Sequence, residues 1–344
     1  MTEQKSNIPI KGYATFDPLK HCLIGSGFKT EWFSDLDIYK NDKIMDPLKR
    51  IADETEEDFQ ILEKILKQAG VKTYRSSVDI EKLKALQDLR PPPVTPRDYF
   101  AVIGEKIHCV NVPHDVMNTF QNTLDQIDKD CLLIDNSRQA WKEPMSTANI
   151  VRIGKRLLWD MGVVPKSTMV TDYIKKWQSE GFEVITSNRG YHSDGCFCVV
   201  KPGCIVSLHD VQDYKKEFPG WDVLYLQDQG WKKVYPFLEI KKKVKGRWWL
   251  EGEEHNDQFI QFVNTWLNDW VGYVEETVFD VNMLSIDQNT IVCNNYNKEV
   301  FDHFKKHKVE PVIFHFRHRF FWDGGVHCVT QDLYREGKME DYFG

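Results

Sequence analysis

Residues 281–314, VNMLSIDQNTIVCNNYNKEVFDHFKKHKVEPVIF, contain the clearest copy of a pattern that recurs along this 344-residue chain. Two short, mainly apolar runs flank turn residues at 287–289 and predict a β-hairpin. Asn297 then suits the N-cap of an amphipathic helix, and residues 312–314 predict a third strand. The stretch therefore predicts a unit of strand, strand, helix and strand.

Four earlier segments follow the same order, which predicts five units in all. A doubly wound sheet would give one strand per helix, so the pattern favours a repeat architecture whose units bury their apolar faces on one another. In a closed ring of such units, loops from distant parts of the sequence would meet at a central axis. The earlier copies are a hairpin at 197–207 with a strand at 223–226, a hairpin at 150–159 with a strand at 182–185, a hairpin at 99–112 with a strand at 131–134, and a looser copy from His21 to Gly70.

Length and composition limit the class of protein. A chain of 344 residues can bury a large core, as one large domain or as two of ordinary size. The formal net charge of −7 disfavours a phosphate backbone as the main partner, so we expect no nucleic-acid binding. No apolar run reaches the roughly 18 to 20 residues of a membrane span, so we expect no membrane partner.

The start of the chain and its cysteines indicate a compartment. Residues 1–7 have neither the apolar core of a signal peptide nor the Arg-rich amphipathic character of a transit peptide. The eight cysteines are scattered rather than densely spaced, which is typical of free thiols in a reducing environment. Both features predict a cytoplasmic protein.

Two stretches interrupt the repeat. Residues 80–98 contain a proline-rich run that predicts an extended crossing loop. Residues 227–275 form an insertion in which a basic run at 241–247 precedes two tryptophans and an acidic segment. Because the acidic residues offset the basic ones, we interpret this part as a solvated loop rather than a nucleic-acid patch. A helix at about 257–270 is expected to bury one side that includes Trp266 and Trp270.

Several polar residues precede or follow the repeat units, where loops would converge. His192 and Asp194 are two apart before one hairpin, so on extended backbone they point the same way. Arg97 and Asp98 hold the equivalent place in an earlier unit, although an Arg–Asp pair is commonly structural. Cys328 follows the last unit after paired glycines, which allow close backbone approach. A thiol, an imidazole and carboxylates at one axis describe a nucleophile, a proton carrier and a cation site.

The order of these motifs resembles that of glycine amidinotransferases of the guanidine-modifying superfamily. The resemblance rests on motifs at 96–98, 143–154, 192–203 and 324–330, which come in the same order here. It implies the pentein fold, an α/β five-bladed propeller with pseudo-five-fold symmetry and strand, strand, helix, strand repeats. It also implies one catalytic domain over residues 1–344, with the insertion at about 227–275.

The resemblance also implies roles for particular residues. The family's nucleophile corresponds to Cys328, its acid/base histidine to His192, and its guanidinium-contacting aspartates to Asp194 and Asp98. Its remaining catalytic carboxylate corresponds to Asn149, where this chain departs from the family because asparagine is neutral; some deiminase and dihydrolase relatives are neutral near this place too. With Asp98 and Asn149, the predicted substrate-binding residues include Arg97 and Gly325.

The activity that the resemblance implies is transfer of the amidino group of L-arginine to an amine such as glycine, through an amidino-Cys328 intermediate and without a cofactor. Two alternatives remain: hydrolysis by an arginine-type deiminase or dihydrolase, and a catalytically silent binding protein, which Asn149 suggests. A homodimer is the default expectation for the oligomeric state. Cys196 and Cys198 have no second pair at zinc spacing, so no metal site is predicted.

Two features close to the nucleophile complete the predictions. His315, Arg317, His318 and Arg319 alternate with phenylalanines, which predicts a strand, and one of these basic groups is a candidate for binding a substrate carboxylate. His327, beside Cys328, is expected to shape the loop rather than to titrate during catalysis.

Overall fold

The computed structural model describes residues 7–77, 93–136, 145–161, 168–187, 192–208, 213–226, 250–267 and 280–344. Within these ranges the strands form five separate three-stranded sheets. The sheets, in their spatial strand order, are β15 (Thr330–Arg335), β1 (Leu19–Ile24) and β2 (Lys72–Arg75); β3 (Ala101–Ile103), β4 (Lys106–Val110) and β5 (Leu132–Asp135); β6 (Ile150–Ile153), β7 (Arg156–Asp160) and β8 (Glu183–Ser187); β9 (Phe197–Lys201), β10 (Cys204–Ser207) and β11 (Asp222–Tyr225); and β12 (Leu284–Ser285), β13 (Thr290–Cys293) and β14 (Glu310–Ile313).

All five sheets use one pairing scheme. The middle strand pairs antiparallel with one neighbour and parallel with the other. A parallel pair needs a long crossover, and each crossover here contains a helix. These helices are α1 (Asp42–Gln68), α3 (His114–Leu124), α4 (Thr168–Ser179), α5 (Tyr214–Glu217) and α8 (Lys298–Lys306). The predicted mixed α/β repeat is thereby confirmed in five units.

The first unit is completed by the other end of the chain. Strand β15 pairs antiparallel with β1, with Ile24 opposite Thr330 and Cys22 opposite Asp332. This pairing explains why the first copy of the repeat looks loose in the sequence: its outer strand comes from the C-terminal segment that follows Cys328. The loop that contains Cys328 therefore leads directly into the pair formed by β15 and β1.

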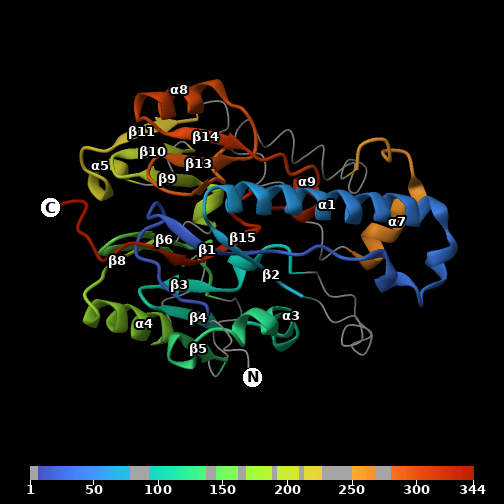
Figure 1. Ribbon diagram of the computed structural model, residues 1–344, viewed down its shortest axis with the longest axis horizontal. Coiled ribbons are helices and arrows are strands. Elements are labelled where there is room, and N and C mark those ends of the chain that lie inside the picture. Colours follow the sequence, from blue (N-terminus) through green and yellow to red (C-terminus); the bar gives the residue numbers. More distant parts are fainter. Residues whose placement is uncertain are drawn as a thin grey trace.

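Local sequence accounts for the units as expected. The side chain of Asn297 accepts N–H groups from the first turn of α8, as predicted for an N-cap. Gly203, in the turn between β9 and β10, has a φ of +80°, which other residues rarely adopt. Figure 1 shows α3, α4, α5 and α8 at the outer edge of the fold, while α1 extends toward α7 (Asp257–Trp266). The helices thus cover the outside and leave the strand ends between them.

Two details of the sequence interpretation are wrong. Trp266, expected to be buried on α7, is 54% exposed, whereas Phe259, Phe262 and Val263 on the same helix are buried. The expected strand at 314–321 is irregular and ends in the short helix α9 (Arg319–Trp322). Trp270 and the basic run at 241–247 lie outside the described residues.

The basic residues before α9 are bound by α1 instead of pointing along a strand. The Arg317 guanidinium donates to both Asp58 and Glu57, and His318 Nε2 lies 2.7 Å from a carboxylate oxygen of Glu54. These ion pairs fix the segment that leads into the Cys328 loop. Arg317 and His318 are therefore engaged with the protein itself rather than with a substrate carboxylate.

A buried cluster of charges lies where three of the units meet. Asp332 of β15 accepts from Arg97 Nη1 at 2.8 Å and from Arg335 Nε at 3.0 Å, and it also binds the guanidinium of Arg152 on β6. All four side chains are about 1% exposed. Because three positive charges surround one carboxylate, the pKa of Asp332 lies well below its usual value, although burial alone would raise it.

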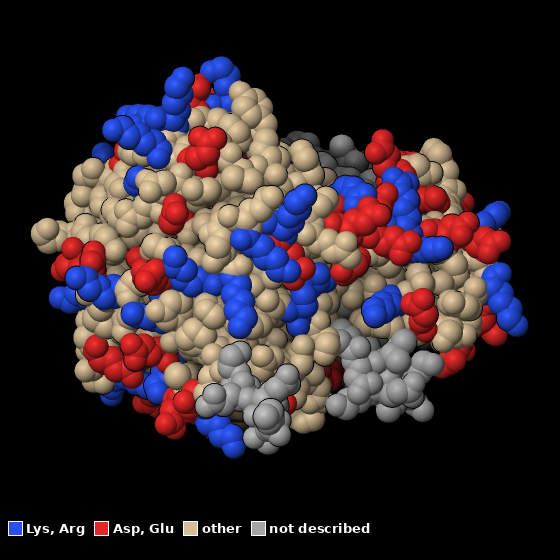
Figure 2. Space-filling view, viewed as in Figure 1, with Lys and Arg blue, Asp and Glu red and all other residues tan. Residues whose placement is uncertain are grey.

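Further features concern the described helices, the charged surface and the cysteines. None of the described helices is long and apolar enough to cross a bilayer. Figure 2 shows acidic and basic side chains intermixed over the face that carries α1. All eight cysteines are free thiols, as predicted.

Three-residue and four-residue 3-10 helices connect the larger elements and hold several site residues. They are η1 (Thr30–Phe33), η2 (Asp37–Lys40), η3 (Pro96–Asp98), η4 (Lys129–Cys131) and η5 (Ser193–Gly195). η3 precedes β3 and η5 precedes β9, so the predicted residues Arg97, Asp98 and Asp194 lie at the entrances of two different sheets. Residues far apart in sequence can thereby contribute to one site.

Candidate active site

The loop that carries Cys328 is held by the side chain of Asn282. Its Oδ1 accepts the backbone N–H of His327 at 2.9 Å and that of Cys328 at 3.4 Å. Gly325 passes so close to this group that a Cβ there would lie 2.4 Å from Oδ1. A side chain at position 325 would therefore displace Asn282, and this close approach explains the glycine.

A second buried amide, that of Asn294, supports the first. Its Oδ1 accepts the backbone N–H of Val326 at 2.8 Å, and its Nδ2 donates to the backbone carbonyl of Asn282 at 2.6 Å. Asn282 is fully buried and Asn294 is 6% exposed. Because a buried amide that loses its partners is costly, this pair of asparagines restricts the loop to one geometry.

The thiol of Cys328 is fully buried and has polar groups on two sides. Asn282 Nδ2 donates to Sγ at 2.9 Å, and Sγ lies 3.7 Å from Asp194 Oδ2, to which the thiol can donate. The sulfur thus lies between an N–H donor and a carboxylate, and the carboxylate can bind a cation next to it.

Asp194 is paired with the histidine that precedes the cysteine. His327 Nδ1 lies 2.6 Å from Asp194 Oδ2. Burial, followed by the charge of Arg97, lowers the pKa of His327 to about 4, against the opposing pull of Asp194. Burial alone would raise the pKa of Asp194, but the hydrogen bond and charge of His327, with His192 and Arg97 further off, lower it. Near neutral pH the pair is thus a neutral imidazole that donates Nδ1–H to an aspartate anion.

One oxygen of this carboxylate remains without a hydrogen bond. Oδ1 of Asp194 is buried and has no hydrogen-bond partner among the described residues. A buried, charged oxygen without a donor is energetically unfavourable. A bound cation with N–H groups would relieve this cost, and it would then lie beside the sulfur of Cys328.

His192 and Asp98 form the more open side of the site. The backbone N–H of Ser193 donates to the carbonyl of Ala148 at 2.7 Å, which holds η5 against the start of β6. His192 Nδ1 then lies 3.8 Å from Asp98 Oδ1, with side chains 37% and 29% exposed. The charge of His192 also acts on Asp194. The imidazole of His192 and the carboxylate of Asp98 therefore lie together, and His192 is close enough to Asp194 for its charge to act on that carboxylate.

Asn149 borders the same segment through its backbone. Its carbonyl accepts from the hydroxyl of Ser193 at 3.4 Å and from the backbone N–H of Asp160 at 2.9 Å. Its side-chain Oδ1 accepts from Ser146 Oγ at 3.1 Å, and Nδ2 donates to the carbonyl of Asp160 at 3.3 Å. The neutral amide thus has a donor and an acceptor among its neighbours, whereas a carboxylate would face the Asp160 carbonyl without a proton to donate.

Arg97 is 1% exposed; its Nε and Nη1 donate to the protein, whereas its buried Nη2 has no hydrogen-bond partner among the described residues. Nε donates to the backbone carbonyls of His327 at 2.7 Å and Thr330 at 2.8 Å, and Nη1 binds Asp332. This arrangement ties the Cys328 loop to the buried arginine cluster. Arg97 therefore holds the loop in position. The lack of a side chain at Gly325 leaves room for the side chain of Asn282.

Behind the site lies a cavity of about 30 Å³, lined in part by Arg97, Asp194, His327 and Cys198. That is the volume open to the centres of water molecules, so the cavity has room for more than one water molecule. His192 and Asp98 are partly exposed, so the site is also accessible from their side.

The structure brings the predicted residues Cys328 and Asp194 into contact and places His192 beside Asp98, with Asn149 and Arg97 next to these groups. Sequence reasoning missed Asn282 and Asn294, and it missed the pairing of His327 with Asp194. A weak signal was present, because Asn282 interrupts an otherwise apolar run at 281–286. A polar residue inside such a run indicates a buried hydrogen-bonding role.

No family model matches the chain. A segment of 152 residues is 22% identical to an L-arginine:L-lysine amidinotransferase of Pseudomonas savastanoi pv. phaseolicola, and it spans 44% of this chain and 32% of that protein. The chain thus covers only about a third of this relative, and the identity is low.

Solved structures show the same fold over nearly the whole chain. The amidinotransferase SxtG of the saxitoxin biosynthetic pathway from Microseira wollei matches with a TM-score of 0.69 and 15% identity, over 98% of this chain and 100% of that one. Inosamine-phosphate amidinotransferase StrB1 of Streptomyces griseus matches with a TM-score of 0.62 and 14% identity, over 97% and 99%.

A hydrolase shares the fold as well. The dimethylarginine dimethylaminohydrolase of Pseudomonas aeruginosa, solved with citrulline, matches with a TM-score of 0.54 and 8% identity, over 91% of this chain and 98% of that one. The chain therefore has the mixed α/β fold of guanidine-modifying enzymes, and both transferases and hydrolases use it.

Proposed function

We propose that the protein is an amidinotransferase that moves the amidino group of L-arginine to an amine through a covalent intermediate on Cys328. One observation carries the proposal: a buried thiol lies 3.7 Å from a buried carboxylate whose other oxygen has no hydrogen-bond partner among the described residues. A guanidinium has the charge and the paired N–H groups that such a carboxylate requires. Similarity in fold to solved amidinotransferases supports the same proposal.

The proposal includes the architecture around the site. We infer that the five sheets are the blades of one closed propeller, in a single catalytic domain over residues 1–344 with an insertion at about 227–275. The repeated pairing scheme supports this inference, and so does the pairing of β15 with β1, which joins the last unit to the first. The propeller axis would then pass near Asp194, Cys328 and Arg97, which come from three different parts of the chain.

Binding of arginine would begin with the two aspartates. Asp194 Oδ1 would accept N–H groups of the guanidinium, and Asp98 would accept others from the open side. Two carboxylates around a planar cation fix the plane of the guanidinium, so that its carbon faces Sγ of Cys328. The positive charge would at the same time favour the thiolate. Asn282 Nδ2, already 2.9 Å from Sγ, would hold the sulfur in line.

In the first half-reaction, the thiolate would form a bond from Sγ to the guanidinium carbon. This carbon is a weak electrophile because resonance spreads the charge over three nitrogens, so the leaving nitrogen must receive a proton as its bond to carbon breaks. His192 is the assigned donor because it is partly exposed and adjacent to Asp98. The products are free ornithine and amidino-Cys328.

In the second half-reaction, an amine would replace the sulfur. His192, now neutral, would take a proton from the incoming amine as its nitrogen bonds to the amidino carbon, and the bond from carbon to Sγ would break to restore the thiolate. With glycine the product is guanidinoacetate. The amine is the variable partner: the sequence resemblance favours glycine, while the matched relative is named for lysine.

The test is product analysis with the purified protein. L-arginine would be supplied alone, with glycine and with L-lysine, and ornithine, citrulline and ammonia would be measured by chromatography. The proposal predicts repeated turnover to ornithine only when an amine is present, together with the guanidino derivative of that amine, and at most one ornithine per chain when arginine is supplied alone. The Cys328→Ala variant is the matched control and should yield none of these products.

Hydrolysis is the outcome that would overturn transfer. Citrulline or ammonia formed from arginine without an amine would identify a deiminase or dihydrolase, which shares the fold. Absence of every product, with arginine still bound, would instead support a silent binding protein and contradict the assignment of Cys328 as a nucleophile.

A further inference from the structure

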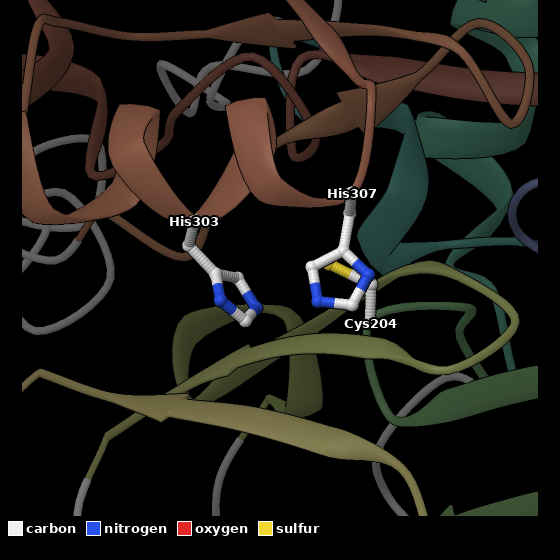
Figure 3. Close-up of side chains that lie close together, drawn as sticks. All are labelled: Cys204, His303 and His307. Carbon is white, nitrogen blue, oxygen red and sulfur yellow. The ribbon is translucent and has the colours of Figure 1, made fainter.

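A second group of a thiol and two imidazoles lies away from Cys328, between the fourth and fifth units. Cys204 begins strand β10, His303 lies in the last turn of α8, and His307 is the C-cap residue of this helix. One potential ligand atom from each of the three side chains lies within 4.8 Å of the others. Figure 3 shows both imidazole rings projecting from α8 toward the sheet that carries Cys204.

Sequence and fold together create this arrangement. His303 and His307 are four residues apart, so they occupy the same face of one helical turn, as do the paired histidines of helical zinc sites. Cys204 follows the glycine of the tight turn between β9 and β10, which directs the first residue of β10 toward α8. Lys201 Nζ, 3.4 Å from the carbonyl of His307, makes a further contact between the two units.

One ring nitrogen in this group lacks a partner. His303 is 8% exposed, and its Nε2 is buried without a hydrogen bond to any of the described residues. A buried imidazole nitrogen without a donor or acceptor is unfavourable unless another atom binds it. This observation is independent of the clustering of the three side chains, and it points to a ligand.

A carboxylate lies beside the group. The carboxylate of Asp222 lies 2.7 Å from His307 Nε2 and 3.9 Å from His303 Nδ1, and Lys306 Nζ lies 2.6 Å from the same oxygen. Because Lys306 offsets the charge of Asp222, the thiolate of Cys204 would supply the negative charge next to a bound cation. One sulfur and two imidazole nitrogens are ligands that Zn²⁺ prefers, with a carboxylate or water as the fourth.

We propose that Cys204, His303 and His307 bind a zinc ion that joins the fourth unit to the fifth, with Asp222 as the adjacent carboxylate. Binding would deprotonate Cys204, so one proton is released for each ion bound. The ligands come from β10 and α8, which belong to different sheets, so the ion would act as a structural link. The proposal does not depend on the reaction at Cys328.

Metal binding is best tested in the Cys328→Ala background, because this removes the other thiol that lies near histidines. Co²⁺ would be titrated as a spectroscopic probe, and Zn²⁺ would then be added in competition. We expect one Co²⁺ per chain, a sulfur-to-cobalt charge-transfer band in the near ultraviolet, displacement by Zn²⁺, and a higher Tm with Zn²⁺.

Variants then assign the ligands. Cys204→Ser should abolish the charge-transfer band, and His307→Asn, at a side chain that is 20% exposed and thus little involved in the core, should weaken Co²⁺ affinity at least about tenfold. Cys131→Ser is the matched control, because this half-buried thiol lies outside the group, and it should leave the band unchanged. A band that persists in Cys204→Ser, full affinity in folded His307→Asn, or no band in the Cys328→Ala protein would overturn the proposal.

Discussion

Asp332 and Asp194 are both buried aspartates whose pKa is held below the usual value, yet their surroundings differ. Asp332 has three arginine partners, and both of its oxygens accept hydrogen bonds. Asp194 has a neutral histidine and a thiol on one oxygen, while the other has no hydrogen-bond partner among the described residues. The protein supplies the guanidinium groups around Asp332, and we propose that the substrate supplies the one missing at Asp194.

This difference separates the structural role from the catalytic one. Arg97 connects the two places, since it binds Asp332 through Nη1 and the carbonyl of His327 through Nε. A buried cluster of ion pairs thus supports the loop that holds the thiol of Cys328. Substitutions at the two aspartates should consequently affect different properties: stability at Asp332 and catalysis at Asp194.

The largest effect is expected from Asp332→Asn. The change removes the carboxylate that forms ion pairs with Arg97, Arg152 and Arg335, which are all buried, so the free energy of unfolding should fall by about 3–5 kcal/mol. Urea denaturation followed by circular dichroism measures this. A loss below about 1 kcal/mol would show that the cluster is not a structural centre.

Asp194→Asn should give the opposite pattern. The amide of asparagine keeps an oxygen that accepts from His327 but lacks the negative charge that would bind a guanidinium. We therefore expect kcat/KM for arginine to fall about 100-fold or more, which corresponds to roughly 3 kcal/mol. Unfolding free energy should change by less than about 1 kcal/mol. If the variant lost stability as strongly as Asp332→Asn, the two aspartates would have the same structural role.

The partners of the two aspartates also predict different pH behaviour. His327 has a pKa of about 4 when folded and an ordinary pKa near 6.5 when unfolded. Between these pH values the unfolded chain binds more protons than the folded chain. His327 therefore contributes about 3 kcal/mol to the free energy of unfolding above pH 6.5, and this contribution is lost as the pH falls to about 4. Arginine guanidinium groups in general remain protonated throughout this range.

The His327→Gln variant isolates that contribution. Denaturation curves at several pH values should show a shallower loss of stability between pH 6.5 and 4 than in the unmodified protein. Other buried histidines, such as His108, contribute to both proteins and cancel in the comparison. Parallel curves for the two proteins would mean that His327 is charged in the folded state, in contradiction to the assigned Asp194 pair.

Asn149→Asp should have the smallest effect. The side chain is hydrogen-bonded to Ser146 and Asp160, so the added carboxylate would keep the first contact and lose the second. We expect KM for arginine to change by less than about tenfold, or roughly 1.4 kcal/mol, in steady-state assays. If the unmodified protein were inactive and the variant active, the neutral Asn149 would be the reason why the unmodified protein lacks activity.

The sequence predicted the repeat and most of the candidate site because both depend on local signals. Hydrophobic alternation and turn residues defined the hairpins, and the motif around Cys328 pointed to a thiol nucleophile. It could not predict that β15 completes the first sheet, because pairing between chain ends leaves no local pattern. Arg97 illustrates the same limit: its pairing with Asp332 depends on contacts that only the folded chain creates.

The asparagines that hold the loop were missed for a related reason. In the sequence, Asn282 is a single polar residue in a predicted short strand. Its contacts are with Gly325, His327 and Cys328, which follow much later in the chain. The cluster of Cys204 with His303 and His307 is comparable, since the histidine spacing is visible in the sequence but the thiol is distant along the chain.

The central claim is that Cys328 accepts the amidino group while Asp194 holds the substrate. Acid quenching during turnover with arginine, followed by proteolysis and mass spectrometry, tests it most directly, with Cys328→Ala as the control. The account predicts that the peptide containing Cys328 gains the mass of one amidino group before the amine is added and loses it afterwards. Ornithine formation without any such adduct on Cys328 would contradict the covalent mechanism.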